Sequence, residues 1–91
     1  MSYAIAKVTA SLLDADYSAA SRNFKAIPGV GSGPMGLTPD DVRARPDYRI
    51  AKQAMDKAFA ELRAFNAVYV KRYRKEIAAT RKAYREQLNR A

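Results

Sequence analysis

The sequence predicts an all-α protein with helices on either side of one glycine-rich break. All four glycines fall within residues 29–36, which makes this stretch the strongest local interruption of regular structure. Neither glycine nor proline occurs from residue 47 onward, where strong helix formers dominate. On both sides of the break, apolar residues recur at spacings of three and four, the repeat of a helix. The expected order is an N-terminal helix or helix pair, a Gly/Pro-rich loop, a short helix and one long amphipathic basic helix.

Residues 1–27 form the predicted N-terminal helical segment. Two apolar series with helical spacing run through it, namely Ile5, Val8 and Leu12, followed by Leu13, Tyr17, Ala20 and Phe24. The competing interpretation is a β-strand over residues 3–10, although alanines on both faces give poor alternation. The segment is therefore expected to be one helix or two.

A Gly/Pro-rich linker over residues 28–37 leads into the third predicted segment, residues 38–91. At its start, Thr38 can cap a helix and Pro39 suits the first helical position. Asp40 and Asp41 then favour the positive end of the helix dipole. Pro46 cannot continue this helix comfortably, so a short helix is expected to end before it. The three segments are predicted to form one small domain.

From Asp47 to Arg90 the sequence predicts a single helix of about 65 Å. Its apolar positions follow three-and-four spacing, apart from a step across Thr80, and are Ala51, Met55, Ala58, Leu62, Phe65, Tyr69, Tyr73, Ile77 and Tyr84. Residues 1–27 are long enough to cover only about half of such a stripe. We therefore expect a protein partner or a second copy of the chain to dock on the long helix through Phe59, Leu62, Phe65, Tyr69 and Tyr73.

Basic residues gather at the C-terminal end. The chain has 17 basic and 9 acidic residues, for a net charge of +8, and residues 71–91 alone carry eight basic and two acidic side chains. This asymmetry indicates contact with a polyanion, either non-specific nucleic acid or an acidic protein surface. The predicted contact residues are Lys71, Arg72, Arg74, Lys75, Arg81, Lys82 and Arg85. The alternative is a solvated helix face supported by pairs such as Arg72 with Glu76 and Lys82 with Glu86.

Several function classes lose support from the composition. The chain has no cysteine and no histidine, which removes the commonest metal ligands and the usual acid–base catalyst at neutral pH. Residues 31–36 match the glycine pattern of dinucleotide sites, but no hydrophobic strand precedes them, and a linker is the favoured interpretation. Asp14, Asp16 and Ser18 begin like a calcium loop that lacks its later glycine and glutamate, so a helix cap or a turn between two helical pieces is expected there. We predict no cofactor, metal, small-molecule substrate or catalytic activity.

The tract from Gly36–Asp40 through Ala64–Asn66 to Lys75–Glu76 resembles small alanine- and arginine-rich proteins encoded by tailed bacteriophages and prophages. The resemblance implies a minor component of a phage particle, or a small inhibitor or adaptor that binds an acidic groove of a host protein. With no apolar run of signal-peptide or membrane-span strength, we expect no membrane association. The expected location is cytoplasmic, meaning the host cytoplasm or the virion for a phage protein.

Overall fold

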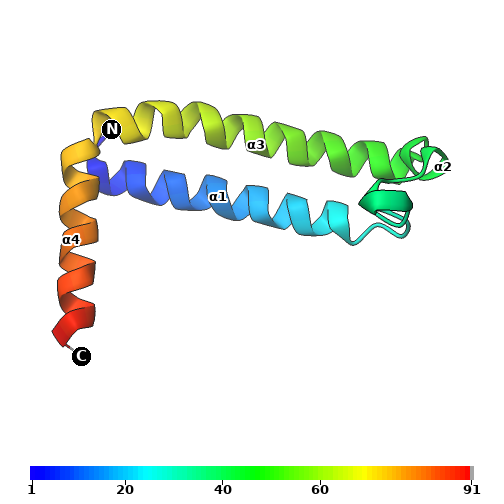
Figure 1. Ribbon diagram of the computed structural model, residues 1–91. Helices are drawn as coiled ribbons and strands as arrows, with labels where there is room; N and C mark the ends of the chain where they lie inside the picture. Colours follow the sequence, from blue (N-terminus) through cyan, green and yellow to red (C-terminus); the bar gives the residue numbers. More distant parts are fainter. Residues whose placement is uncertain (91) are drawn as a thin grey trace.

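A computed structural model describes residues 1–90 and confirms the all-α fold. Its elements are α1 (Tyr3–Lys25), a 3₁₀ turn (Pro34–Gly36), α2 (Asp40–Arg43), α3 (Pro46–Arg72) and α4 (Arg74–Arg90). Figure 1 shows α1 and α3 side by side as an antiparallel hairpin, with α2 at the closed end. Helix α4 leaves the open end and runs across the hairpin direction (Figure 1). The final residue of the predicted segment 38–91 lies outside the described residues.

Helix α1 is one uninterrupted helix, which settles the choice between a helix, a helix pair and a strand. The Ser2 hydroxyl accepts a hydrogen bond from the Ile5 amide and so caps the first turn. The residues from Asp14 to Ser18, expected to form a cap or a turn between two helical pieces, lie in mid-helix. That prediction was wrong because short polar side chains on an exposed helix face are compatible with helix wherever packing on the opposite face stabilises it.

The hairpin is held by apolar positions that repeat at three and four along both helices. The Tyr17 and Phe59 ring centroids lie 5.2 Å apart, and the Phe24 and Tyr48 centroids are also 5.2 Å apart. These tilted rings are typical of favourable aromatic pairs. The interior is thin, since the buried hydrophobic residues among those described are Ala6, Val42, Tyr48 and Tyr73.

The glycine-rich loop carries its own hydrogen bonds. The Gly31 amide donates to the Thr38 hydroxyl at 3.1 Å, and the Gly33 amide donates to the Leu37 carbonyl at 2.7 Å. Thr38 therefore tethers the loop and does not cap α2, whose N-cap position is Pro39. The prediction of a Thr38 cap was wrong because the Thr38 hydroxyl accepts a hydrogen bond from the Gly31 amide and not from an amide of α2.

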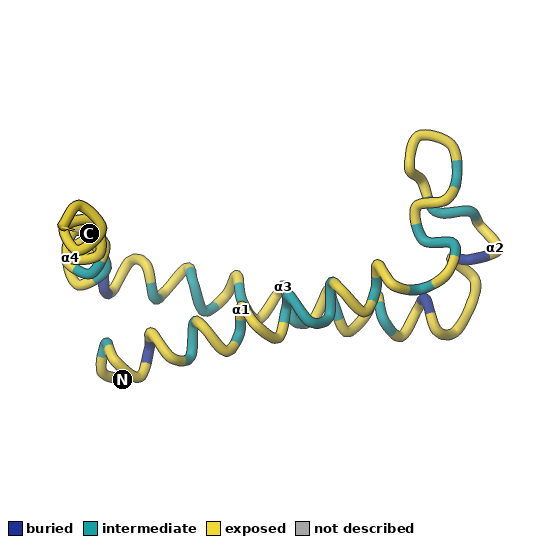
Figure 2. The backbone as a smooth tube through the Cα atoms, turned by 90° about the horizontal axis from the view of Figure 1, so that it is seen from below, coloured by how far each residue is buried: buried dark blue, intermediate teal, exposed yellow. Residues whose placement is uncertain are grey.

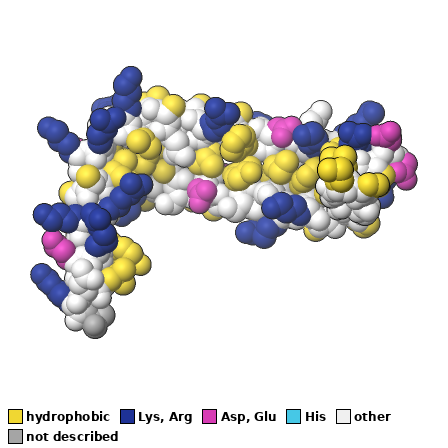
Figure 3. Space-filling model, in the orientation of Figure 1, with side chains coloured by type: hydrophobic (Ala, Val, Ile, Leu, Met, Phe, Trp, Pro, Cys, Tyr) yellow, Lys and Arg dark blue, Asp and Glu magenta, His cyan; other side chains and the backbone are white. Residues whose placement is uncertain are grey.

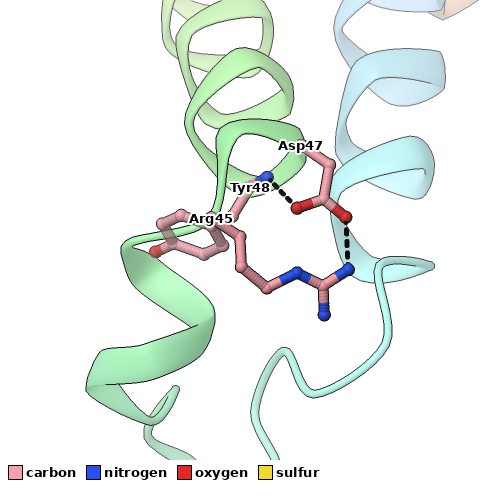
Figure 4. Close-up of polar contacts among 3 residues, drawn as sticks. All are labelled: Arg45, Asp47 and Tyr48. Atoms are coloured by element: carbon pink, nitrogen blue, oxygen red, sulfur yellow. Dashed lines mark hydrogen bonds and ion pairs between the residues drawn. The ribbon is translucent and has the colours of Figure 1, made fainter.

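The junction between α2 and α3 is fixed by Asp47 (Figure 4). One oxygen of the Asp47 carboxylate accepts from the Tyr48 amide at 2.9 Å, and the other receives the Arg45 guanidinium at 2.8 Å. Pro46 occupies the first turn, where its missing N–H costs nothing. The carboxylate also lies at the positive end of the α3 dipole, so α3 begins at a defined residue.

The long C-terminal helix is broken at Tyr73, which corrects the prediction of one rod from Asp47 to Arg90. Tyr73 has φ −111° and ψ 28°, outside the helical range, and its hydroxyl donates to the Met1 carbonyl. Across the same corner, the Tyr3 and Thr80 hydroxyls lie 3.0 Å apart. Contacts with the N-terminus therefore hold this elbow, and because no glycine or proline marks it, helix propensity could not reveal it.

The molecule is strongly elongated. Its radius of gyration is 18.1 Å, whereas a compact 91-residue domain has one of about 12 Å. Figure 2 shows that residues of α4 beyond the elbow are almost entirely exposed, while α1 and α3 bury only the stripes that face each other. Helix α4 is thus an arm carried by a two-helix scaffold.

Candidate nucleic-acid interface

Helix α4 concentrates positive charge on one side. Its basic residues other than Arg90 are Arg74, Lys75, Arg81, Lys82 and Arg85, here called the basic arc. At 100° per residue these five fall within about 120° of the helix circumference. From Arg74 to Arg85 the arc extends about 16 Å along the helix axis. All five residues are exposed.

The charges of the basic arc are not neutralised by ion pairs within residues 1–90. Among residues 1–90, ion pairs join Arg43 with Asp40, Arg45 with Asp47 and Lys52 with Asp56, so none involves α4. Two pairs that were expected to support a solvated face, Arg72 with Glu76 and Lys82 with Glu86, are not among these ion pairs, and the elbow separates Arg72 from Glu76. Figure 3 shows lysine and arginine side chains gathered around the elbow and along α4.

The seven predicted contact residues are divided between two helices. Lys71 and Arg72 belong to the last turn of α3, before the elbow, and the other five form the basic arc. The Arg72 guanidinium carbon lies 5.4 Å from the centroid of the Tyr73 ring, a cation–π distance. The structure therefore brings five of the predicted residues onto one surface and leaves the remaining two at its edge.

The predicted docking stripe on α3 is largely occupied by the chain itself. Tyr69 stacks on Tyr3 with ring centroids 6.3 Å apart and on Phe65 at 5.7 Å. Leu62 and Phe65 are half-buried, and Tyr73 is buried. Phe59 packs on Tyr17 but remains 43% exposed. The expectation that this stripe lies uncovered was wrong over α3, because the 23-residue α1 runs alongside most of the 27-residue α3 and packs on the stripe.

An apolar stripe remains uncovered on α4. Tyr84 is 61% exposed and Leu88 is 56% exposed, and both lie on the same side as Ile77. At 100° per residue this stripe borders the basic arc next to Arg81. Tyr84 is therefore exposed and available for stacking on a base, whereas Tyr69 and Tyr73 pack at the elbow. Sequence inspection missed Leu88, although its position four residues after Tyr84 marks it as a member of the stripe.

The elbow also changes the acidity of one tyrosine. Desolvation by burial raises the pKa of the Tyr69 hydroxyl above its usual 10.0, and hydrogen bonding with Tyr3 raises it further, while the charge of Arg81 lowers it. The direction shows that the protonated phenol is favoured in the packed elbow. Tyr69 is therefore a neutral packing residue at the base of the arm.

No protein-family model, curated protein or solved structure matches the chain. Residues 1–90 contain no group of three or more His, Cys, Asp or Glu side chains placed to hold a metal ion. Over the same range, none of the helices combines the length and the apolar character that crossing a membrane requires. The exposed basic arc is the most distinctive surface feature among the described residues.

Proposed function

We propose that this chain is a non-enzymatic helical interaction protein whose α4 arm contacts the phosphate backbone of nucleic acid within a larger assembly. The observation that carries the proposal is the basic arc, in which five exposed cationic side chains on one side of α4 have no carboxylate partner in residues 1–90. Cationic side chains that neutralise phosphates release condensed counterions, which drives binding without any reading of sequence.

The length of the arc suits a phosphate backbone. Arg74 and Arg85 are about 16 Å apart along the helix axis. Phosphates of one duplex strand repeat about every 3.4 Å along the axis. The arc therefore spans about five phosphates, one for each of its cationic side chains.

The contact is expected to be independent of base sequence. The basic arc consists of arginine and lysine, with Ala78 near its centre and no asparagine or glutamine among the five. Phosphate contacts position a protein on nucleic acid, whereas sequence is read mainly by contacts to base edges. Tyr84, exposed beside the arc, adds one aromatic surface on which an unpaired base could stack.

The rest of the fold acts as a scaffold that presents the arm. Contacts with the N-terminus support the elbow, and helix α4, which carries the arc, runs away from the hairpin instead of continuing α3 (Figure 1). The resemblance to small phage-encoded proteins stays a prediction, and it would make the assembly a phage particle or a nucleoprotein complex. Capture of an acidic groove on a host protein is the alternative that the following experiment addresses.

The test compares two fourfold charge reversals in binding to a generic DNA duplex at about 50 mM salt. Reversal of Arg74, Lys75, Arg81 and Lys82 to glutamate removes most of the basic arc. A matched control reverses four exposed basic residues of the hairpin, Lys7, Arg22, Lys25 and Arg49. Both variants change the net charge by the same amount, so only the position of the charge differs.

We expect the α4 reversal to reduce duplex affinity by at least roughly 100-fold while the hairpin reversal causes a much smaller loss. Circular dichroism must show unchanged helicity in both variants. Equal losses in the two variants would mean that net charge alone attracts the duplex. Absence of wild-type binding to DNA and RNA at this salt concentration would contradict the proposal and favour an acidic protein partner.

A further inference from the structure

Helix α3 carries a second stripe beside the one that packs on α1. Its members recur at alternating spacings of four and three, and they are Ile50, Ala54, Lys57, Glu61, Ala64 and Val68, here called the outer stripe. Such spacing is the seam of a two-stranded coiled coil. The positions that α3 presents to α1 form a separate series, so the outer stripe is not used by the hairpin.

Every member of the outer stripe is exposed. Ile50 is 68% exposed and Val68 is 64% exposed, although α3 already packs along another side. Shallow grooves border both ends of the stripe on one side of the hairpin. One groove joins Ile50 and Ala54 to Ala19 and Ile27, and the other joins Ala64 and Val68 to Met1. The stripe and the adjoining part of α1 thus form one continuous face.

The outer stripe is chemically symmetric about position 59. Ile50 and Val68 lie nine residues on either side of this position, and Ala54 and Ala64 lie five residues on either side. Lys57 and Glu61, two residues on either side, have opposite charges. Two such helices placed antiparallel across a two-fold axis at residue 59 would pair isoleucine with valine, alanine with alanine and lysine with glutamate. A two-fold interface requires this kind of self-complementarity.

The central charges are available for such an exchange. Lys57 and Glu61 are four residues apart in the helix, yet neither takes part in an ion pair among the described residues. In the antiparallel arrangement each copy would contribute one lysine and one glutamate, which gives two equivalent ion pairs near the axis. The alanines on either side allow the helices to approach closely, as small residues do at helix–helix contacts.

The exposed area of the single chain also points to a missing neighbour. The chain exposes 7115 Å², whereas a folded monomer of 10.1 kDa exposes about 5300 Å². The total excess is roughly 1800 Å², and the projecting arm accounts for part of it. A stable interface needs only about 800 Å² from each partner, so the excess is sufficient for one.

We infer that the occupant of this face is a second copy of the chain, bound antiparallel through the outer stripe. Ile5 and Leu12 of α1 are 59% and 61% exposed, and at 100° per residue they fall on the side of α1 that carries Ala19, so they extend the contact. The dimer is a four-helix bundle with an α4 arm at each end. The two-fold relation follows from the stripe alone and does not depend on what the arms bind.

The first test measures mass by sedimentation equilibrium at about 100 µM protein. The wild-type chain is expected at twice its monomer mass of 10.1 kDa. Val68→Glu, in the outer stripe, is expected to give a monomer. Val70→Glu is the matched control, because Val70 is 52% exposed and lines the groove on the other side of the hairpin, with Lys7 and Asn66. A monomeric wild-type chain, or equal effects of the two variants, would overturn the inference.

The second test uses charge exchange between chains. Lys57→Glu alone and Glu61→Lys alone each place like charges across the axis, so each variant is expected to dissociate at least tenfold more readily than wild type. An equimolar mixture of the two variants restores both opposite-charge contacts and is expected to form a mixed dimer. Mixing cannot restore a contact within one helix, so failure of the mixture to associate would contradict the antiparallel arrangement.

Discussion

Replacement of Tyr3 with alanine is expected to straighten the elbow. The Tyr3 ring lies 6.3 Å from the Tyr69 ring and 5.6 Å from the Tyr73 ring, and its hydroxyl is 3.0 Å from that of Thr80. Each aromatic contact contributes about 0.5–1.5 kcal/mol and the hydrogen bond about 1 kcal/mol. The variant therefore loses about 2–4 kcal/mol of the interactions that pack the elbow, of which the Thr80 hydrogen bond reaches α4 directly.

An opposing free energy favours a straight helix. The sequence around Tyr73 contains no glycine or proline, and joining α3 to α4 would pair backbone groups that the two helix ends leave without helical partners. Each recovered hydrogen bond contributes about 1 kcal/mol, so a few of them offset the loss of helix-end contacts. Removal of Tyr3 should therefore shift the population from the bent form toward one continuous helix.

The measurement is the distance between spin labels at Arg49→Cys and Asn89→Cys, two exposed positions in a chain with no other cysteine. A continuous helix would separate these residues by about 60 Å. In the bent form two helical segments of about 36 Å and 24 Å meet at the elbow, so the labels are expected to lie clearly closer together than 60 Å. Tyr3→Phe keeps the ring contacts and should remain bent. An unchanged distance in Tyr3→Ala, with helicity preserved, would refute the assignment of the elbow to these contacts.

Three further substitutions test the packing. Burial raises the Tyr69 pKa, so the folded state holds the phenol proton more tightly than the unfolded state does. The resulting contribution to the free energy of unfolding should be fully present below pH 10 and should fall above it. Tyr69→Phe should lessen that fall, measured by chemical denaturation at about pH 9 and about pH 11. Gly29 has φ 91°, and an added Cβ would lie 2.7 Å from a Val42 methyl carbon, so Gly29→Ala should cost about 1–3 kcal/mol in urea unfolding. Ala6 is 1% exposed, so the larger side chain of Ala6→Leu should overpack the hairpin. The free energy of unfolding should fall by about 1–3 kcal/mol, which is measured as a lower thermal midpoint.

Periodicity was sufficient to predict the helices but not which stripe would pack. Leu13, Tyr17, Ala20 and Phe24 were identified from spacing, and all four lie on the side of α1 that is half-buried. The earlier series of Ile5, Val8 and Leu12 has the same spacing, yet it is exposed. Spacing reports that residues share a face of a helix, while the partner that covers the face depends on tertiary structure.

The elbow shows the same limit for helix ends. Local signals predicted the break at Pro46 because proline lacks an amide hydrogen and restricts the preceding residue. The break at Tyr73 has no such local signal. It depends on contacts with Met1 and Tyr3 at the other end of the chain, and on the contact between Tyr3 and Thr80 in α4. The basic arc was predictable as a set of charges, but its separation from Lys71 and Arg72 depended on that tertiary contact.

The central claim, that the basic arc binds phosphates, is tested most directly by the salt dependence of affinity for a generic DNA duplex. Five phosphate contacts predict a slope of about −4.5 in a plot of log association constant against log salt concentration. With Arg74, Lys75, Arg81 and Lys82 reversed to glutamate, the slope should shrink to about −1 or less in magnitude. A wild-type slope near zero, or one that this reversal leaves unchanged, would contradict the account.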